Sequence, residues 1–480
     1  CLKKKLFELQ NQGEQFPREQ STMEVAVGKR KGGNRIVEEN ILAILDADDR
    51  KDTRENNDNR SSFLEAVRSA CLAPVNGSPP TMKMCEAVFK ILRAGKHLDL
   101  IMGSFWLLRE LEKRFPRMTV SDASESKEPQ LVMSEEAWCP FVLNLDSTHQ
   151  SKEAVNKSND RPLDSLGFHL LIQELVEFAN KVQSPETKSL SNLLLFQYLV
   201  DVLEGDFMMR NKLFEETLNW IHLRESLLNL LLNSRKIQYK NFIRHCLILL
   251  CGLSHPSAES RVDVDMIDNV LESDSHGAVG IASAEVRHNT CTALQKFLVV
   301  IMELDVSRKK ADAQGSTTRA DGARTPLLEL VLDEIIYDSD MLSPFLQGFD
   351  EPKWKTELIL QYFMKYAAKP TVRTRRSNAP PEDITISGTL KGFSNITTSK
   401  SIAKKIGSDI VQVLIAHAFQ AHLSLCSSKQ DGDGTASPAE MCEDVITAFT
   451  NLKTANQQLE ILPIGKEALF TAAMILSTKS

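Results

Sequence analysis

The chain has 480 residues, of which 42% are hydrophobic, and its formal net charge is −7. This apolar content excludes a globally disordered chain, and the acidic balance excludes a wholesale nucleic-acid coat, so any DNA contact must come from a local patch. Nine cysteines are scattered without tight spacing, which favours reduced thiols over a disulfide framework. We find no uninterrupted apolar run of about 18 residues and no signal-peptide core, so we expect a soluble intracellular protein.

An N-terminal tail precedes the first predicted helix. Residues 1–33 mix lysine, glutamine and glycine and carry the basic run GKRKGG at 28–33, which is typical of a mobile tail. The chain begins with Cys1, and Met23 offers an alternative natural start. The first predicted helix covers 36–45, and a highly charged break follows it.

Three further helices form a first predicted layer. Ser62 and Glu65 make a Ser-x-x-Glu capping box, which predicts a helix that begins at Ser62. Two apolar stretches predict the other helices, over 81–95 and 97–115. The polar residues at 119–133 then predict a loop.

The chain is organised around the apolar stretch 189–253. The segment SNLLLFQYLVDVLEG, at 191–205, is apolar nearly all the way round, which predicts a helix that is buried on most sides. A glycine–aspartate pair at 205–206 predicts a break after it. Leucines at i, i+4, i+7 and i+8 predict a second helix, and a third helix is expected over 237–253, after an asparagine–serine break.

Polar loops separate the helices that follow. Residues 254–282 form a long predicted loop with one short helix at 264–271. A strong apolar pattern predicts a helix over 284–306, and a polar loop is expected over 307–324.

The C-terminal third holds two predicted groups of helices. Thr325 and Pro326 have N-cap and N1 chemistry, which predicts a helix start. The interval between the two groups, 369–399, is basic and then proline-rich without periodicity, which predicts a surface linker. The helices expected in these groups cover 326–338, 351–368, 408–425, 438–453 and 464–476.

These patterns predict an all-α fold. Successive apolar helices with short connections must pack on one another, because no strand pattern offers a sheet. No internal repeat of fixed length is visible, so we expect an irregular armadillo- or HEAT-like helical-repeat stack with long polar loops. The predicted divisions are a disordered tail, a helical-repeat body, a basic and proline-rich loop, and C-terminal helices that continue the stack, over 1–33, 34–368, 369–399 and 400–480.

Metal sites find little support in the sequence. The segment 429–440 resembles a calcium loop, with Asp431, Asp433 and Gly434 in register, but Lys429 stands where an anionic ligand is required. Ser437 and Glu440 are better explained as the N-cap and capping-box residues of the next helix. His417 shares a face with Ile410, Val413 and Leu414, which favours a satisfied core histidine over a metal ligand. No zinc spacing is present, and we predict no metal site and no cofactor.

The sequence also lacks the signatures of an enzyme. GKRKGG does not have phosphate-loop spacing and follows no predicted strand, and no glycine-framed serine nucleophile occurs. We therefore predict no catalytic residues and a protein without enzymatic activity.

Basic segments are the most suggestive local feature. Lys369, Arg373, Arg375 and Arg376 occur in the run KPTVRTRR, with no acidic residue until Glu382. Such a run serves as a nuclear import signal, a phosphate contact or a site for an acidic partner, and the competing explanation is a solvated linker. The same alternatives apply to Lys29, Arg30 and Lys31, and to SRKK at 307–310.

Several stretches together resemble a known plant family. They are SSFLEAVRSACLAPVNGSPPTMKM, EETLNWIHLRESLLNLLLNSRK, VVIMELDVSRKKADAQGSTTRADGARTP, DEPKWKTELILQYFMKYAAKPTVRTRR, KKIGSDIVQVLIAHAF and ILPIGKEALFTAAM. In this order they resemble the plant negative regulator of systemic acquired resistance, from about residue 34 to the C-terminus, and the tail 1–22 does not match.

The resemblance implies a nuclear, armadillo-like protein without enzymatic activity. It implies a subunit of the SMC five-six (structural maintenance of chromosomes) complex, similar in role to non-SMC element six. The implied partners are SMC five, SMC six and a second non-SMC subunit, and the implied roles are DNA repair by homologous recombination and repression of defence genes. The alternatives are a co-repressor or DNA-binding regulator that acts at chromatin through basic patches, and, less favoured, a helical hydrolase or calcium sensor.

Overall fold

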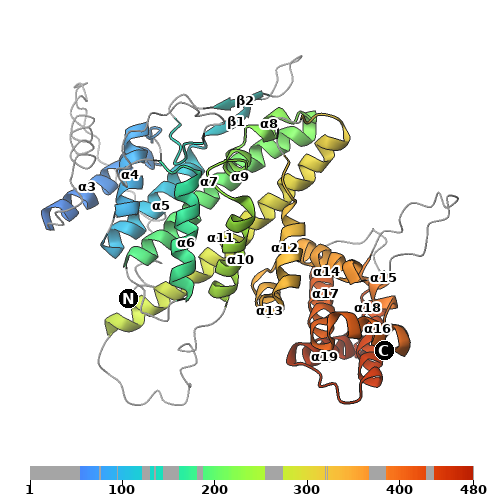
Figure 1. Ribbon diagram of the computed structural model, residues 1–480. Coiled ribbons are helices and arrows are strands. Elements are labelled where there is room, and N and C mark those ends of the chain that lie inside the picture. The colour runs from blue at the N-terminus through green and yellow to red at the C-terminus, as the bar shows by residue number, and fades with distance from the viewer. Residues whose placement is uncertain are drawn as a thin grey trace, which may run out of the picture. The chain divides into compact units, whose positions relative to one another are not determined.

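The computed structural model describes residues 54–74, 77–94, 96–121, 130–133, 137–143, 162–180, 187–254, 274–318, 321, 323–366, 385–428 and 437–478. Contacts between Cα atoms divide the chain into two compact units, Cys1–Arg324 (unit 1) and Thr325–Ser480 (unit 2). Helices dominate the described residues of both units, which confirms the predicted all-α fold (Figure 1). The sequence analysis assigned residues 325–368 to the same helical-repeat body as residues 34–324. The contacts between Cα atoms instead group residues 325–368 with the C-terminal helices.

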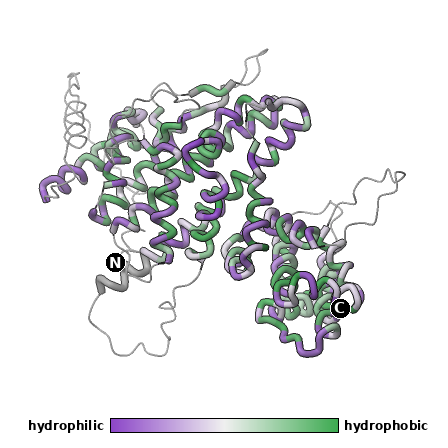
Figure 2. The backbone as a smooth tube through the Cα atoms, viewed as in Figure 1, coloured by the Kyte–Doolittle hydropathy of each residue, from purple (hydrophilic) through white to green (hydrophobic). Residues whose placement is uncertain are grey.

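Unit 1 consists of nine described helices and one short hairpin. The helices are α3 (Arg54–Cys71), α4 (Met82–Ala94), α5 (Leu98–Arg114), α6 (Ser165–Asn180), α7 (Thr187–Thr217), α8 (Ile221–Arg224), α9 (Leu227–Leu232), α10 (Tyr239–Ser254) and α11 (Asp274–Ala313). The contacts among α3, α4 and α5 confirm the predicted first layer. Figure 2 shows apolar residues recurring along these helices beside polar ones, as expected when each helix buries one face.

Helix α7 is the central element of unit 1. Every residue from Leu193 to Val200 is buried, so the helix is enclosed on all sides over two turns. It contacts α4, α5, α6, α8, α9 and α11, and α11 packs along much of its length (Figure 1). The prediction of a helix buried on most sides is therefore confirmed.

The predicted break at Gly205 and Asp206 is wrong, because α7 continues to Thr217. The Asp206 carboxylate accepts hydrogen bonds from Arg210 Nε at 3.0 Å and from the Leu227 backbone N–H at 2.8 Å. Its side chain thus links α7 to the start of α9 instead of ending α7. The residue that follows the helix, Leu218, has a positive φ of 56°. The single leucine helix predicted beyond it is divided into α8 and α9.

An aromatic cluster connects four helices of unit 1. Phe168 on α6 is fully buried, and its ring lies 6.0 Å from Phe196 on α7, 6.1 Å from Phe242 on α10 and 5.7 Å from Phe297 on α11. Phe141, from the segment before α6, lies 5.8 Å away on the same cluster. Rings at these separations contribute beyond the area that they bury, so this cluster is a major part of the core.

Three local predictions in unit 1 need correction. The segment 119–133 is not simply a loop, because β1 (Met118–Ser121) and β2 (Gln130–Met133) pair antiparallel with Met118 opposite Met133. Ser62 does not begin a helix, since α3 starts eight residues earlier, at Arg54, and the Ser62 hydroxyl donates to the Asp58 carbonyl. Helix α11 extends at both ends into predicted loops, to Asp274 and to Ala313. The predicted helices at 36–45 and 264–271 lie outside the described residues.

Unit 2 is a second helical body, built around α17 (Ser408–Ser428). Its other helices are α12 (Leu327–Tyr337), α13 (Ser339–Gly348), α14 (Pro352–Tyr366), α15 (Ile386–Lys391), α16 (Ile396–Ile406), α18 (Pro438–Ala455) and α19 (Pro463–Ser477). Helix α17 contacts α14, α15, α16, α18 and α19. Among the described helices it alone is long and apolar enough to cross a membrane, and 56% of that stretch is buried, as in the core helix of a globular domain.

The capping residues in the sequence predicted where α12 and α18 begin, with an error of one position for α12. Pro326, not Thr325, is the N-cap residue of α12, one position later than predicted. The Ser437 hydroxyl accepts the Glu440 backbone N–H at 3.2 Å and Pro438 is the first helical residue of α18, so the predicted cap is confirmed. Helix α15 and the first turn of α16 lie in the second half of the predicted linker 369–399, whose residues 369–384 lie outside the described part.

Candidate interaction surfaces

The basic residues singled out in the sequence lie mostly outside the described residues. Lys369, Arg373, Arg375 and Arg376 fall in the interval 367–384, and Lys29, Arg30 and Lys31 fall in 1–53. Their proposed contacts with the import machinery, phosphate or a partner therefore stay predictions.

The third basic run, SRKK at the end of α11, has structural partners. The Ser307 hydroxyl donates to Asn211 Oδ1 at 2.8 Å. Lys310 pairs with the Glu215 carboxylate, and its ammonium also lies 5.8 Å from the centre of the Phe214 ring. These contacts hold α11 against the C-terminal half of α7, so packing within unit 1 accounts for Ser307 and Lys310 of this run.

A lysine patch on α15 and α16 is a better candidate for an anionic partner. Lys391, Lys400, Lys404 and Lys405 are all exposed, and the sequence has no aspartate or glutamate from Thr385 to Ser408. Among the described residues, none of these four ammonium groups pairs with a carboxylate; Lys405 donates to the Tyr366 carbonyl at 3.4 Å. Sequence reasoning missed the patch because it treated the segment that holds Lys391 as a linker and predicted no helix over Lys400, Lys404 and Lys405, although the acid-free composition was a readable signal.

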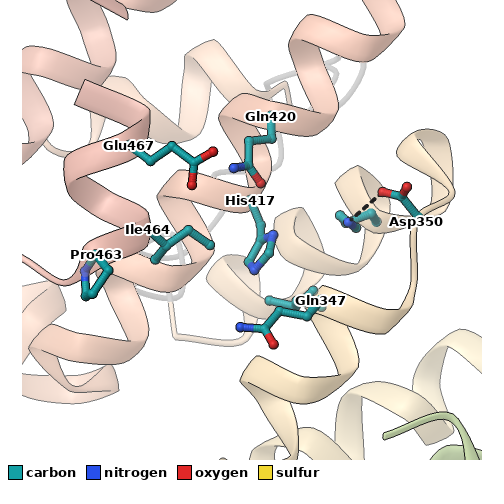
Figure 3. A pocket seen from close by; sticks show the side chains of 9 residues that line it. Gln347, Asp350, His417, Gln420, Pro463, Ile464 and Glu467 are labelled. Atoms are coloured by element: carbon teal, nitrogen blue, oxygen red, sulfur yellow. Dashed lines mark hydrogen bonds and ion pairs between the residues drawn. The ribbon is translucent and has the colours of Figure 1, made fainter. Parts of the chain in front are cut away.

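Unit 2 also contains a pocket of about 380 Å³ (Figure 3). It is lined by Leu346 and Gln347 of α13, Asp350, Lys355 of α14, His417 and Gln420 of α17, and Pro463, Ile464 and Glu467 of α19. The Lys355 ammonium is buried and donates to the Asp350 carboxylate at 3.4 Å. Asp350 itself is 86% exposed, so the ion pair lies at the mouth of the pocket.

His417 extends into this pocket between Gln347 and Ile464 (Figure 3). The side chain is 4% exposed, and among the described residues neither ring nitrogen has a hydrogen-bond partner of good geometry, although the Gln420 side chain interacts with the ring. Its burial agrees with the predicted core histidine, but the prediction that its polar atoms are satisfied is wrong. Burial, together with the nearby Lys355 cation, lowers the pKa of His417 to about 4, so the imidazole is neutral at physiological pH. A neutral imidazole offers one N–H donor and one acceptor.

Helix α19 bears an exposed apolar stripe. Phe470 is 68% exposed and Met474 is 50% exposed, although both lie in the interior of a helix that packs on α17 and α18. Single exposed apolar residues are ordinary, but an aromatic residue and a methionine at i and i+4 form a contiguous surface. This surface is a candidate docking site for another chain.

The described residues hold no group of three histidine, cysteine or acidic side chains that could bind a metal ion. The calcium-like residues 429–436 lie outside them. Cys85 is half-buried and Cys246 is buried in helical packing. Burial, the largest influence, raises the pKa of Cys85 to about 12 and also raises the pKa of Cys246. Such thiols are poor nucleophiles.

Comparisons with known proteins agree on one family. The SNI1 middle domain matches residues 115–351, and the SNI1 C-terminal domain matches residues 367–480. The chain is 46% identical over 446 residues to the negative regulator of systemic acquired resistance SNI1 of Arabidopsis thaliana. The matched region covers 92% of this chain and 95% of that protein. No solved structure matches the chain.

Proposed function

Because the chain belongs to the SNI1 family, we propose that it is a non-enzymatic nuclear scaffold that negatively regulates systemic acquired resistance. As a finer part of the same proposal, the chain is a subunit of the SMC five-six complex. It binds a second non-SMC subunit and the SMC five and SMC six proteins, and it serves DNA repair by homologous recombination.

The 46% identity to the Arabidopsis regulator over nearly the whole of both chains carries this proposal. The helical architecture supports the scaffold part, since helices that stack along the chain present extended surfaces on which other chains bind. The exposed stripe on α19 and the lysine patch on α15 and α16 are surfaces of this kind. The assignment to a particular complex comes from the family resemblance and not from any one residue.

Complementation of an Arabidopsis line that lacks SNI1 tests the proposal. We expect the chain to restore repression of defence genes and tolerance of DNA-damaging agents, and a fluorescent fusion to accumulate in the nucleus. A variant with Arg373, Arg375 and Arg376 changed to alanine should accumulate less in the nucleus if KPTVRTRR is the import signal. A stably expressed chain that leaves defence genes derepressed would contradict the regulatory role.

Direct contact with DNA is the second candidate function, and the lysine patch is the observation that favours it. Four exposed ammonium groups on two adjacent short helices, without a neighbouring carboxylate in the same stretch of sequence, form a surface that attracts phosphate. The net charge of −7 opposes non-specific binding elsewhere on the chain.

A triple variant, with Lys400, Lys404 and Lys405 changed to alanine, tests DNA contact. If the patch binds duplex DNA, the variant should bind more weakly, and the slope of log K against log salt should fall by up to about 0.9 for each lysine that contacts a phosphate. The matched control changes the same number of exposed lysines elsewhere, Lys83, Lys113 and Lys466. Equal affinity and equal slope for the two triple variants would remove this candidate.

A further inference from the structure

The pocket and the apolar stripe described above belong to one surface. Pro463 and Glu467 line the pocket, and Phe470 and Met474 form the stripe. At about 100° per residue these four positions fall within roughly 60° of the circumference of α19, and Ile464, which also lines the pocket, widens the arc to roughly 120°. The stripe therefore borders the pocket on α19. We call this combined surface, formed by the pocket, Phe470 and Met474, the α19 groove.

We propose that the α19 groove binds an amphipathic helix of a partner protein, which inserts a glutamine side chain into the pocket toward His417 and places a lysine or arginine beside Glu467. The apolar face of this helix covers Phe470 and Met474. This inference rests on the scaffold function proposed above and specifies the chemistry of one of its partners.

The hydrogen-bonding chemistry of the His417 ring determines which partner side chain fits the pocket. His417 is 4% exposed and, among the described residues, neither ring nitrogen makes a well-formed hydrogen bond, although the Gln420 side chain interacts with the ring. A buried polar group without a good hydrogen bond is costly. A carboxamide supplies both a donor and an acceptor, which matches the donor and acceptor of a neutral imidazole. Gln347 and Gln420 line the same pocket and offer further amide groups for the inserted side chain. The methylene groups of a glutamine would contact Leu346 and Ile464.

The charges around the pocket exclude an acidic side chain and favour a basic neighbour. Lys355 already pairs with Asp350, so its charge is compensated. Glu467 then leaves a net negative charge at the rim, which repels a carboxylate and attracts a cation on the bound helix.

The continuous stripe favours a protein segment over a free small molecule. An apolar helix face is recognised by residues at i, i+3 or i+4, and i+7 of a partner helix that lies in a groove. A small molecule in the pocket would leave Phe470 and Met474 exposed.

The test is a selection of displayed helical peptides of about 20 residues, randomised on one face, against the full-length chain. Enriched peptides are then titrated against five proteins: wild type, Phe470→Asp, His417→Leu, Glu467→Lys and the control Tyr337→Asp. Tyr337 is an exposed aromatic residue of α12, 85% exposed, so its variant introduces the same charge away from the groove. Circular dichroism establishes that each variant is folded, and Phe470→Asp, at an exposed position, keeps the test valid if His417→Leu does not fold.

We expect enriched peptides to combine an apolar face with a glutamine and a nearby basic residue. Their affinity should fall at least about tenfold for Phe470→Asp and for His417→Leu and stay unchanged for Tyr337→Asp. Glu467→Lys should also weaken binding, and exchanging the basic residue of the peptide for glutamate should restore it.

Three outcomes would overturn the inference: no enrichment of any peptide, full affinity for Phe470→Asp, or an acidic residue in place of the glutamine. The selection uses no nuclear component, so its failure leaves the scaffold proposal in place. Conversely, if affinity purification of the chain from nuclear extract recovers no subunit of the SMC five-six complex, the chain can still bind the selected peptides.

Discussion

His417 and Arg324 are buried polar residues with opposite environments. The Arg324 guanidinium donates to the Asp305 carboxylate at 2.7 Å and lies 5.7 Å from the centre of the Tyr239 ring, so it links α11 to α10. Removing one member of such a buried pair typically costs about 3–5 kcal/mol, because the other charge remains without a partner. His417 has no such partner, and its burial is tolerated because the ring stays neutral.

The neutral state of His417 predicts a specific dependence of stability on pH. Its pKa is about 4 in the folded chain and about 6.5 when unfolded, so the unfolded state binds the proton first as the pH falls. The contribution of the neutral His417 ring to the free energy of unfolding is therefore fully present above about pH 6.5. It is lost progressively as the pH falls toward 4. Between pH 7 and pH 5 this histidine should remove about 2 kcal/mol from the free energy of unfolding.

Thermal or denaturant unfolding of wild type and His417→Leu at both pH values measures this contribution. The variant should lose about 2 kcal/mol less than wild type on acidification, because all other titrating groups are shared. His288→Leu, at an exposed position, is the matched control and should follow wild type. Identical pH dependence in wild type and His417→Leu would show that the buried ring does not resist protonation.

Among the elements, the long apolar helices could be predicted, but the end of α7 could not. The packing of α7, α10, α14 and α17 follows from apolar spacing over three or more turns. The end of α7 depends on Leu218 at positive φ, a conformation that a leucine adopts only when surrounding packing imposes it. No residue type in the sequence marks such a position.

The sequence pattern did not predict the short helices α13, α15 and α16, for a related reason. Helices of about ten residues or fewer are marginal alone and form where tertiary contacts stabilise them. Helix α13 also contains Pro344, which lacks the N–H that a helix interior requires. Helices α15 and α16 carry polar and basic residues that resemble a linker in composition, although Thr385 and Asn395 cap them.

The two glycines Gly205 and Gly407 provide a test of the helix assignments. Gly205 is exposed inside α7, and a methyl group at its Cβ position would meet nothing within 4 Å. Gly205→Ala should therefore raise the free energy of unfolding by about 0.5–1 kcal/mol, as expected for a helix interior. Gly407, with a φ of 102° after α16, is the matched control, and Gly407→Ala should lower stability.

Denaturant unfolding followed by circular dichroism distinguishes the outcomes. A destabilised Gly205→Ala protein would mean that the helix breaks at this glycine, as the sequence pattern alone suggested.

At the scale of the whole molecule, the fold and family could be predicted while the α19 groove could not. The all-α fold follows from periodicity, and the family from stretches distributed along the chain. The pocket combines side chains from Leu346 to Glu467, contributed by four helices and by Asp350, between α13 and α14, so only the folded unit brings them together. The lysine patch was readable in composition, because it lies in a stretch without acidic residues.

The scaffold proposal makes the most direct claim about the whole molecule, that it acts by binding other chains. Affinity purification of the tagged full-length chain from nuclease-treated plant nuclear extract, analysed by mass spectrometry against a tag-only control, measures this. The proposal predicts recovery of SMC five, SMC six and a second non-SMC subunit at moderate salt. Recovery of histones or transcription factors without any of these subunits would contradict it.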